Sequence, residues 1–171
     1  SGGVDSSIVA AVAVEALGPE NVFGVLMPSR YSSDHSISDA EQLATNLGIA
    51  TYTVPIEPAH EAFTGMLAPN LADRQIDVGD ITDQNLQSRI RGVILMAMAN
   101  EHGWLVFTTG NKSEAAVGYS TLYGDTAGAF AVIRDVWKLT VYDLCAWRTE
   151  VAGRAIIPTT VLTKPPSAEL T

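Results

Sequence analysis

The chain has 171 residues, of which 47% are hydrophobic and 17% charged, which is enough sequence for about one soluble, globular domain with a sizeable core. Its formal net charge of −9 argues against nonspecific attraction to nucleic acid or to anionic lipid. No apolar run reaches the roughly 18 residues that a membrane span needs, and the one cysteine, Cys145, can form no internal disulfide. We therefore expect a cytoplasmic protein with no membrane and no nucleic-acid partner, in which Cys145 contributes to helix packing.

The sequence opens with SGGVDSS at residues 1–7, and a helical pattern rich in alanine and valine continues over 6–17. The adjacent glycines Gly2 and Gly3 allow the backbone to approach a ligand closely, and Asp5 can hold a cation. Hydroxyl groups are available from Ser1, Ser6 and Ser7. Because the N–H groups and the dipole of a helix start attract anions, this segment predicts a polyphosphate-binding loop.

The segments after the loop alternate between strand and helix patterns. Residues 22–28 form an apolar run that suits a strand buried on both faces of a parallel sheet. A helical stripe over 37–47 follows and ends at a glycine, and 50–56 predict a second strand. The next segment, 57–72, is weakly helical, and 74–83 have no clear pattern.

The strongest helical pattern covers 84–103, with Thr82 or Asp83 as a candidate N-cap and a glycine at its end. Residues 104–109 then predict a strand that ends in a loop. The sequence contains no internal repeat and no linker. We therefore predict one α/β domain over 1–171, a Rossmann-like, doubly wound parallel sheet with helices on both faces.

The two ends of the sequence lead to a further expectation. A phosphate loop in an α/β protein normally follows a buried strand, whereas this sequence begins with the loop itself. Residues 161–171 stop without a closing helix. We expect a domain that is truncated at both ends and lacks its central strand.

The opening loop lacks the Lys-Ser/Thr pair of a Walker A motif and the GxGxxG spacing of dinucleotide-binding folds. It resembles instead the SGGxDS loop of the ATP pyrophosphatase, or PP-loop, family, which binds pyrophosphate. Four later blocks are QNLQSRIRG, TTGNKSEAAVGYSTLYGD, DVWKLTVYDL and KPPSAEL. In order and spacing they resemble the synthetase domain of NAD synthetases over nearly the whole chain, and MPSRYSSDHS resembles the glutamine-dependent branch.

The resemblance implies a ligase that forms a carbon–nitrogen bond. In this family ATP adenylates the carboxylate of deamido-NAD with release of pyrophosphate, and ammonia then displaces AMP to give NAD. The resemblance further implies Mg²⁺ with the ATP, ammonia from glutamine through an N-terminal glutaminase domain, and a homodimer or larger homo-oligomer. No protein nucleophile is required, which agrees with the absence of a GxSxG motif from the sequence.

The resemblance also implies roles for individual residues. Asp5 and Lys138 are expected to be catalytic, and Asp5 and Glu114 to hold the magnesium. The residues expected to bind ATP are Ser1, Gly2, Gly3, Val4, Asp5, Ser6, Ser7, Met27, Thr109, Lys138 and Ser167. Lys138 is one of only ten basic residues, and a triphosphate needs positively charged partners.

The residues expected to bind deamido-NAD are Asn85, Arg89, Glu114, Tyr119, Tyr123 and Asp125. Asn85 and Arg89 lie one helical turn apart and share a face, while Arg91 is expected to point elsewhere, toward a partner subunit. The ammonia-dependent branch has a lysine and an aspartate where this chain has Leu122 and Ala129. Those two substrate contacts are therefore not expected here.

Two alternatives stay open from the sequence. Another PP-loop amidotransferase or an RNA-modifying enzyme would share the loop, although an RNA-modifying member should show basic patches or a cysteine pair. A non-catalytic nucleotide-binding sensor would keep the fold without needing the pair of Asp5 and Glu114. Turnover of ATP to pyrophosphate with deamido-NAD distinguishes all three.

Overall fold

The structure is a computed structural model that describes residues 2–71, 81–164 and 170. The elements in chain order are α1 (Val4–Leu17), the 3-10 turn η1 (Pro19–Asn21), β1 (Phe23–Leu26), α2 (Asp34–Leu47), β2 (Ala50–Thr53), α3 (Glu57–Leu71), α4 (Ile81–His102), β3 (Phe107–Thr108), α5 (Lys112–Val117), β4 (Phe130–Ala131), α6 (Lys138–Ala152) and α7 (Thr159–Thr163). Among these residues, no helix is long and apolar enough to cross a membrane.

The strands pair in parallel, as the alternating sequence pattern predicts. β1 pairs with β2 from Phe23 opposite Ala50 to Leu26 opposite Thr53, and β3 pairs with β4. In the described part of the chain these strands form two separate two-stranded sheets. Parallel strands connected through helices confirm the predicted α/β class.

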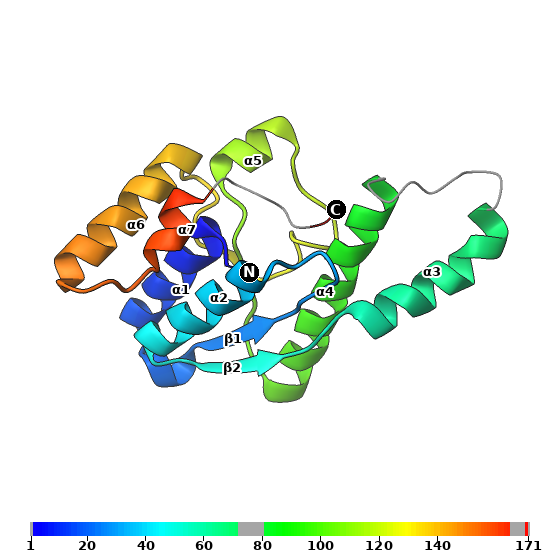
Figure 1. The fold of residues 1–171 in the computed structure, drawn as a ribbon, viewed down its shortest axis with the longest axis horizontal. Helices are drawn as coiled ribbons and strands as arrows, with labels where there is room; N and C mark the ends of the chain where they lie inside the picture. Colours follow the sequence, from blue (N-terminus) through cyan, green and yellow to red (C-terminus); the bar gives the residue numbers. More distant parts are fainter. Residues whose placement is uncertain (1, 72–80, 165–169, 171) are drawn as a thin grey trace.

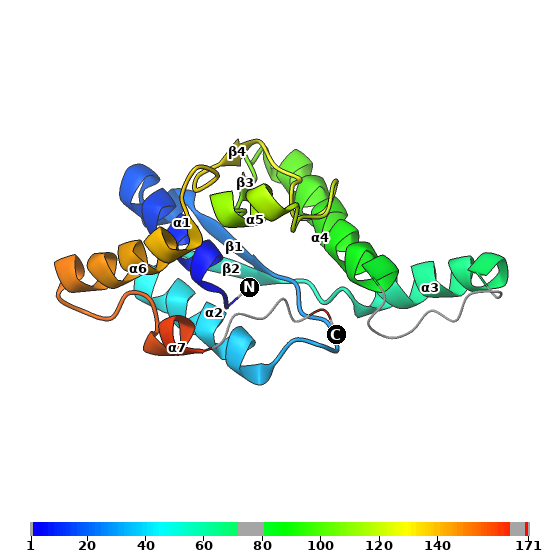
Figure 2. The same cartoon turned by 90° about the horizontal axis from the view of Figure 1, so that it is seen from above.

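Helices cover both sides of the β1–β2 pair. Figure 2 shows α2 on one side and α4 on the other, and α1 and α6 lie together beside α2. α3 contacts α4 at its start and then extends away from the rest of the molecule (Figure 1). This arrangement places the amino-terminal end of α1 near the centre of the molecule.

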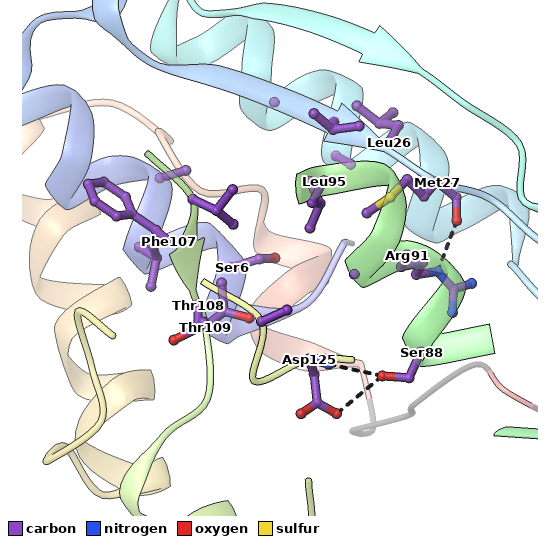
Figure 3. Close-up of a pocket in the computed structure, with 18 of the residues that line it drawn as sticks. Ser6, Leu26, Met27, Ser88, Arg91, Leu95, Phe107, Thr108, Thr109 and Asp125 are labelled. Atoms are coloured by element: carbon purple, nitrogen blue, oxygen red, sulfur yellow. Dashed lines mark hydrogen bonds between the residues drawn. The ribbon is translucent and has the colours of Figure 1, made fainter. Parts of the chain in front are cut away.

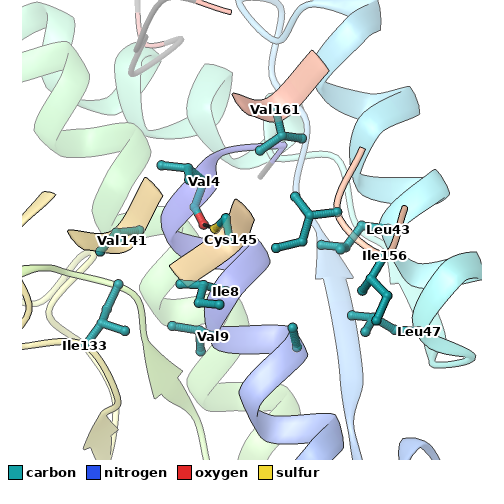
Figure 4. Packing of buried hydrophobic residues seen from close by; sticks show 12 residues of the cluster. Val4, Ile8, Val9, Leu43, Leu47, Ile133, Val141, Cys145, Ile156 and Val161 are labelled. Carbon is teal, nitrogen blue, oxygen red and sulfur yellow. Dashed lines mark hydrogen bonds between the residues drawn. The ribbon is translucent and has the colours of Figure 1, made fainter. Parts of the chain in front are cut away.

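The main hydrophobic core lies between α1, α2, α6 and α7 (Figure 4). The buried residues of α1 are Val4, Ser7, Ile8, Val9, Ala11 and Ala13, so this helix is covered on more than one face. Cys145 of α6 is fully buried in this core, with its Sγ 3.7 Å from the Val4 carbonyl oxygen. The predicted packing role of Cys145 is confirmed, and this core fixes the phosphate loop against α6.

Some local predictions need correction. The weak helical pattern that begins at 57 is confirmed as α3 over Glu57–Leu71, whereas within the described residues the predicted strand at 104–109 is paired only at Phe107 and Thr108. Trp104 instead stacks on Phe23, with ring centroids 4.4 Å apart. Most of the unpatterned segment 74–83 lies outside the described residues.

The start of α4 also differs from the prediction. α4 begins at Ile81, so Asp83 lies inside the helix instead of capping it. Its carboxylate is 2.6 Å from Nε2 of His60, which is 6% exposed. His60 is therefore a buried, paired side chain, because α3 packs against α4 at this point.

Candidate functional site

The phosphate loop leads directly into α1. Gly3 is the N-cap in an extended conformation, and within the described residues no side chain caps this helix start. The hydroxyls of Ser6 and Ser7 both donate back to the Gly3 carbonyl, at 3.0 and 2.8 Å. The N–H groups of the first turn therefore face the position that an anion would take. Ser1, the other predicted hydroxyl of this loop, lies outside the described residues.

Gly2 is packed too tightly for any other residue. A Cβ atom at this position would lie 2.5 Å from the carbonyl oxygen of Ser36 and 2.8 Å from its Cα, both backbone atoms of α2. Real Cβ atoms essentially never approach backbone this closely. The glycine of the predicted loop is thus needed for contact with α2 as well as for approach to a ligand.

A charged cluster lies beside the start of α1. Lys138 at the start of α6 forms an ion pair with Asp5, and its Nζ is 3.9 Å from Oε1 of Glu114. Asn111 donates from Nδ2 to the other carboxylate oxygen of Asp5, at 2.8 Å. The structure therefore brings together three predicted residues from α1, α5 and α6.

Glu114 is held by the cap of α5. Asn111 accepts a hydrogen bond from the Glu114 backbone N–H, and the Glu114 carboxylate accepts one from the Asn111 backbone N–H, each at 3.0 Å. Burial raises the pKa of Glu114 above its ordinary value, and the Asp5 charge adds to this effect against the opposing influence of the Asn111 N–H and Lys138. The sequence signal for Asn111 is the capping-box spacing N-x-x-E.

A cavity of about 860 Å³ opens between the β1–β2 pair and β3 (Figure 3). Met27 directly follows β1 and Thr109 directly follows β3, so both lie at the carboxyl ends of strands, where open α/β sheets bind ligands. The predicted site residues that line it are Gly2, Ser6, Met27, Asn85, Thr109, Tyr119 and Asp125. The lining therefore includes predicted ATP residues and predicted deamido-NAD residues, whereas Asp5, Lys138, Arg89 and Glu114 are not among the residues that line it.

One wall of the cavity is built by α4 and the segment 118–126. Asn85 accepts a hydrogen bond from the Thr121 hydroxyl at 2.7 Å, and Arg89 donates from Nε to the Leu122 carbonyl at 3.2 Å. Asp125 accepts the Thr121 backbone N–H with both oxygens at 3.0 Å. Asn85 and Arg89 therefore share one helix face, as predicted, and this face holds the segment in place.

Ser88 and Arg91 are site residues that the sequence reasoning missed. The Asp125 backbone N–H donates to Ser88 Oγ at 3.0 Å, and Arg91 donates from Nε to the Met27 carbonyl at 3.1 Å (Figure 3). Arg91 lines the cavity and points away from the face shared by Asn85 and Arg89, as predicted, while its expected role toward a partner subunit stays a prediction. It lines the cavity because α4 packs across the end of β1, a tertiary contact that helical spacing cannot indicate.

Other predicted residues stand apart from the cavity. The side chain of Tyr123 is 83% exposed at a positive φ of 63°, and it is not among the lining residues. Val4 and Ser7 are buried on the core side of α1, and the Ser7 hydroxyl is already hydrogen-bonded to the Gly3 carbonyl. Ser167 lies outside the described residues.

The chain matches one family of known proteins over its whole length. The family model described as NAD synthase matches residues 1–171. The chain is 56% identical over 170 residues to a glutamine-dependent NAD(+) synthetase of Thermotoga maritima and 58% identical to one of Synechocystis, covering 99% of this chain in both cases. It spans 29% and 30% of the lengths of these two curated relatives.

Solved structures give the same result. A glutamine-dependent NAD+ synthetase from Acinetobacter baumannii in complex with ADP has a TM-score of 0.92 and 41% identity, over 98% of this chain and 31% of that chain. An NMN synthetase from Francisella tularensis has a TM-score of 0.82 and 31% identity, over 99% of this chain and 65% of that chain. Both structures support the fold, and the first of these proteins was solved in complex with ADP.

Proposed function

The chain belongs to the NAD synthase family, and we propose that it catalyses the ATP-dependent amidation of deamido-NAD to NAD. ATP adenylates the nicotinate carboxylate with release of pyrophosphate, and ammonia then displaces AMP. The observation that carries the proposal is the cluster of Asp5, Lys138 and Glu114 beside an uncapped helix start. At the start of a helix, carboxylates can hold a metal ion, and a lysine together with the helix N–H groups can bind the phosphates of a polyphosphate.

Lys138 is assigned to the phosphates of ATP. Its ammonium group already lies against two carboxylates, and its backbone N–H donates to Ser113 Oγ at 3.0 Å, which fixes the start of α6. The charge is therefore held in place before ATP arrives. Developing negative charge on the phosphates is best stabilised by groups that need no rearrangement, so this position favours catalysis.

Magnesium fits the same carboxylates. Mg²⁺ commonly uses one or two protein carboxylates together with phosphate oxygens, and Asp5 and Glu114 offer such a pair. Within the described residues no group of three or more His, Cys, Asp or Glu side chains could hold a metal by itself, so the remaining ligands would be phosphates and water. When bound, the ion neutralises phosphate charge between Asp5, Glu114 and the nucleotide.

Deamido-NAD is assigned to the wall formed by α4 and the segment 118–126. Asn85 and Arg89 already organise this segment through Thr121 and Leu122, and Tyr119 and Asp125 line the cavity beside them. This wall lies opposite Ser6 and Thr109 of the ATP side in Figure 3, across the cavity. A carboxylate bound here would face the α-phosphate of ATP bound at the loop.

The described side chains act by binding and positioning. Cys145 is the obvious soft nucleophile of the sequence, but it is fully buried in the core and burial raises its pKa to about 12. It cannot attack a carboxylate in the cavity. Direct attack of ammonia on the adenylate, without a covalent enzyme intermediate, is therefore the chemistry that this site supports.

We assign the ammonia to glutamine, hydrolysed by a part of the protein outside this chain. The relatives named glutamine-dependent are more than three times as long as the matched region, which leaves room for such a domain. We further propose a homodimer or larger homo-oligomer and a cytoplasmic location, in keeping with the family and with a single, buried cysteine.

The proposal is tested with the full-length protein that contains this chain. ATP, Mg²⁺ and deamido-NAD, with either ammonia or glutamine, should give NAD and pyrophosphate in equal amounts. Nicotinate mononucleotide is the matched comparison substrate, because a structural neighbour is an NMN synthetase. Pyrophosphate release without amide formation, or preference for the mononucleotide, would contradict the assignment of deamido-NAD.

A further inference from the structure

Asp39 is a buried carboxylate outside the cluster described above. It lies in α2, is 7% exposed, and is held by two donors from the carboxyl-terminal part of the chain. Thr160 donates its hydroxyl to one carboxylate oxygen, and Nζ of Lys164 lies 3.0 Å from the other. A buried charge needs such partners, so Asp39 fixes the position of Lys164 relative to α2.

Lys164 makes a second contact on the same helix. Its Nζ donates to Ser36 Oγ at 3.1 Å, and Ser36 lies in the first turn of α2, where Ser33 caps the helix. The ammonium group thus bridges Asp39 and Ser36, which are one helical turn apart. It holds the beginning of α2 at a defined place against the end of α7.

The backbone of Ser36 also packs directly against Gly2 of the predicted phosphate loop. A Cβ on Gly2 would lie 2.5 Å from the Ser36 carbonyl oxygen, and both residues line the cavity. Any displacement of the first turn of α2 must therefore move Gly2. The position of the loop backbone, and with it the N–H groups offered to phosphate, depends on where Ser36 is held.

We propose that Asp39 and Lys164 form a positioning pair that sets the phosphate loop through Ser36 and Gly2. Neither residue is among those that line the cavity. Its contribution is to keep the loop in the conformation that accepts ATP, and in this sense it rests on the proposed function. Loss of the pair should weaken ATP binding and leave the deamido-NAD wall on α4 unaffected.

The other end of α2 offers a matched control. Asn46 donates from Nδ2 to the carbonyls of Ala155 and Ile156, at 3.0 and 2.9 Å. This contact also joins α2 to the carboxyl-terminal segment, but it lies ten residues, or about 15 Å along the helix, from Ser36. Asn46→Ala removes these two hydrogen bonds, and the one that Gln42 donates to Asn46 Oδ1, without touching Gly2.

The experiment uses Asp39→Asn, Lys164→Met, their combination and Asn46→Ala in the full-length protein. Titration calorimetry gives the Kd of ATP, and steady-state kinetics gives KM for deamido-NAD. We expect each single variant of the pair to raise the Kd of ATP about tenfold, the effect of one lost charge-assisted hydrogen bond. The Kd of ATP in the double variant should be at most about twice the Kd in either single variant, because both substitutions remove the same interaction.

In the same experiment KM for deamido-NAD in the variants of the pair should stay within about twofold of the wild-type value. Asn46→Ala should change neither this KM nor the Kd of ATP by more than about twofold. Lys164→Arg should recover part of the ATP affinity, because the guanidinium keeps the charge near Asp39. If Asp39→Asn does not fold, Lys164→Met and Thr160→Val remain, since both change partly exposed side chains around an intact Asp39.

Three results would overturn the positioning role: an unchanged Kd of ATP, equal losses for both substrates, or the same loss in Asn46→Ala. These results are distinguishable from failure of the proposed function. If the wild-type protein binds ATP but does not amidate deamido-NAD, the proposed function is wrong, and the Kd of ATP in the variants still decides the role of the pair.

Discussion

Lys138 and Asp5, 133 residues apart in the sequence, form an ion pair at the amino-terminal end of α1. The same Asp5 carboxylate accepts a hydrogen bond from Asn111, a residue 1% exposed. Asp5 therefore has a structural partner as well as a charged one. Substitutions of Asp5 must therefore distinguish loss of the ion pair with Lys138 from loss of the hydrogen bond with Asn111.

Asp5→Asn tests the metal role of Asp5 more specifically than Asp5→Ala does. Its side-chain oxygen can still accept from Asn111, whereas the negative charge that suits Lys138 and Mg²⁺ is lost. We expect pyrophosphate formation to fall by about 100-fold or more, with little change in thermal stability. Asp5→Ala should lose the same activity and, in addition, about 1–3 kcal/mol of stability, because Asn111 is left unpaired. Pyrophosphate release near the wild-type rate in Asp5→Asn would contradict the assignment.

Lys138→Met should raise KM for ATP about tenfold or more while KM for deamido-NAD changes little, because the charge faces phosphate. Lys112→Met is its control. Lys112 also forms an ion pair, at 2.7 Å with Asp135, but that partner is 91% exposed at the surface. Steady-state kinetics with each substrate varied in turn measures both constants. Equal losses for the two substrates in Lys138→Met would point to a structural role.

Asn111→Ala should destabilise the fold by about 1–3 kcal/mol, because it removes the cap of α5 and a hydrogen bond to Asp5. Asn21→Ala removes an exposed amide that donates to the Leu17 carbonyl, so its cost should be smaller. Urea unfolding, followed by circular dichroism, gives both free energies. A stability loss in Asn111→Ala no greater than in Asn21→Ala would show that the buried network contributes little.

Substitution of Arg89 and of Arg91 should each raise KM for a different substrate. Arg89 holds the segment 118–126 through Leu122, so Arg89→Met should raise KM for deamido-NAD by about tenfold. Arg91 holds the Met27 carbonyl at the end of β1, so Arg91→Met should raise KM for ATP instead. Each variant serves as the control for the other. The same pattern in both variants would contradict the division of the cavity into two sides.

Cys145 should be unreactive in the folded protein. Burial raises its pKa from 9.0 to about 12, so at pH 8 the thiol stays neutral and enclosed. Iodoacetamide at pH 8 should modify Cys145 in urea and not in buffer, as mass spectrometry can measure. Because the folded pKa is raised, the unfolded thiol ionises first, and stability should fall as pH rises above 9. Rapid labelling under native conditions would contradict the buried placement.

Much of the site could be predicted from short stretches of sequence. The Gly-Gly turn, the α1 pattern and the position of Thr109 after a strand are local features, because turn conformations, helical spacing and strand ends depend on neighbouring residues. The shared face of Asn85 and Arg89 follows from helical geometry in the same way. These local features, with the resemblance of five sequence blocks, were sufficient to indicate the family.

Tertiary structure alone decided which distant side chains meet. Asn111 and Lys138 reach Asp5, Arg91 reaches the Met27 carbonyl, and Lys164 reaches Asp39, over separations of 64 to 133 residues. Such contacts depend on how α1, α2, α4 and α6 pack around the strands. A sequence pattern fixes the face of a helix, but the neighbour of that face is chosen only when the helices bury their apolar surfaces together.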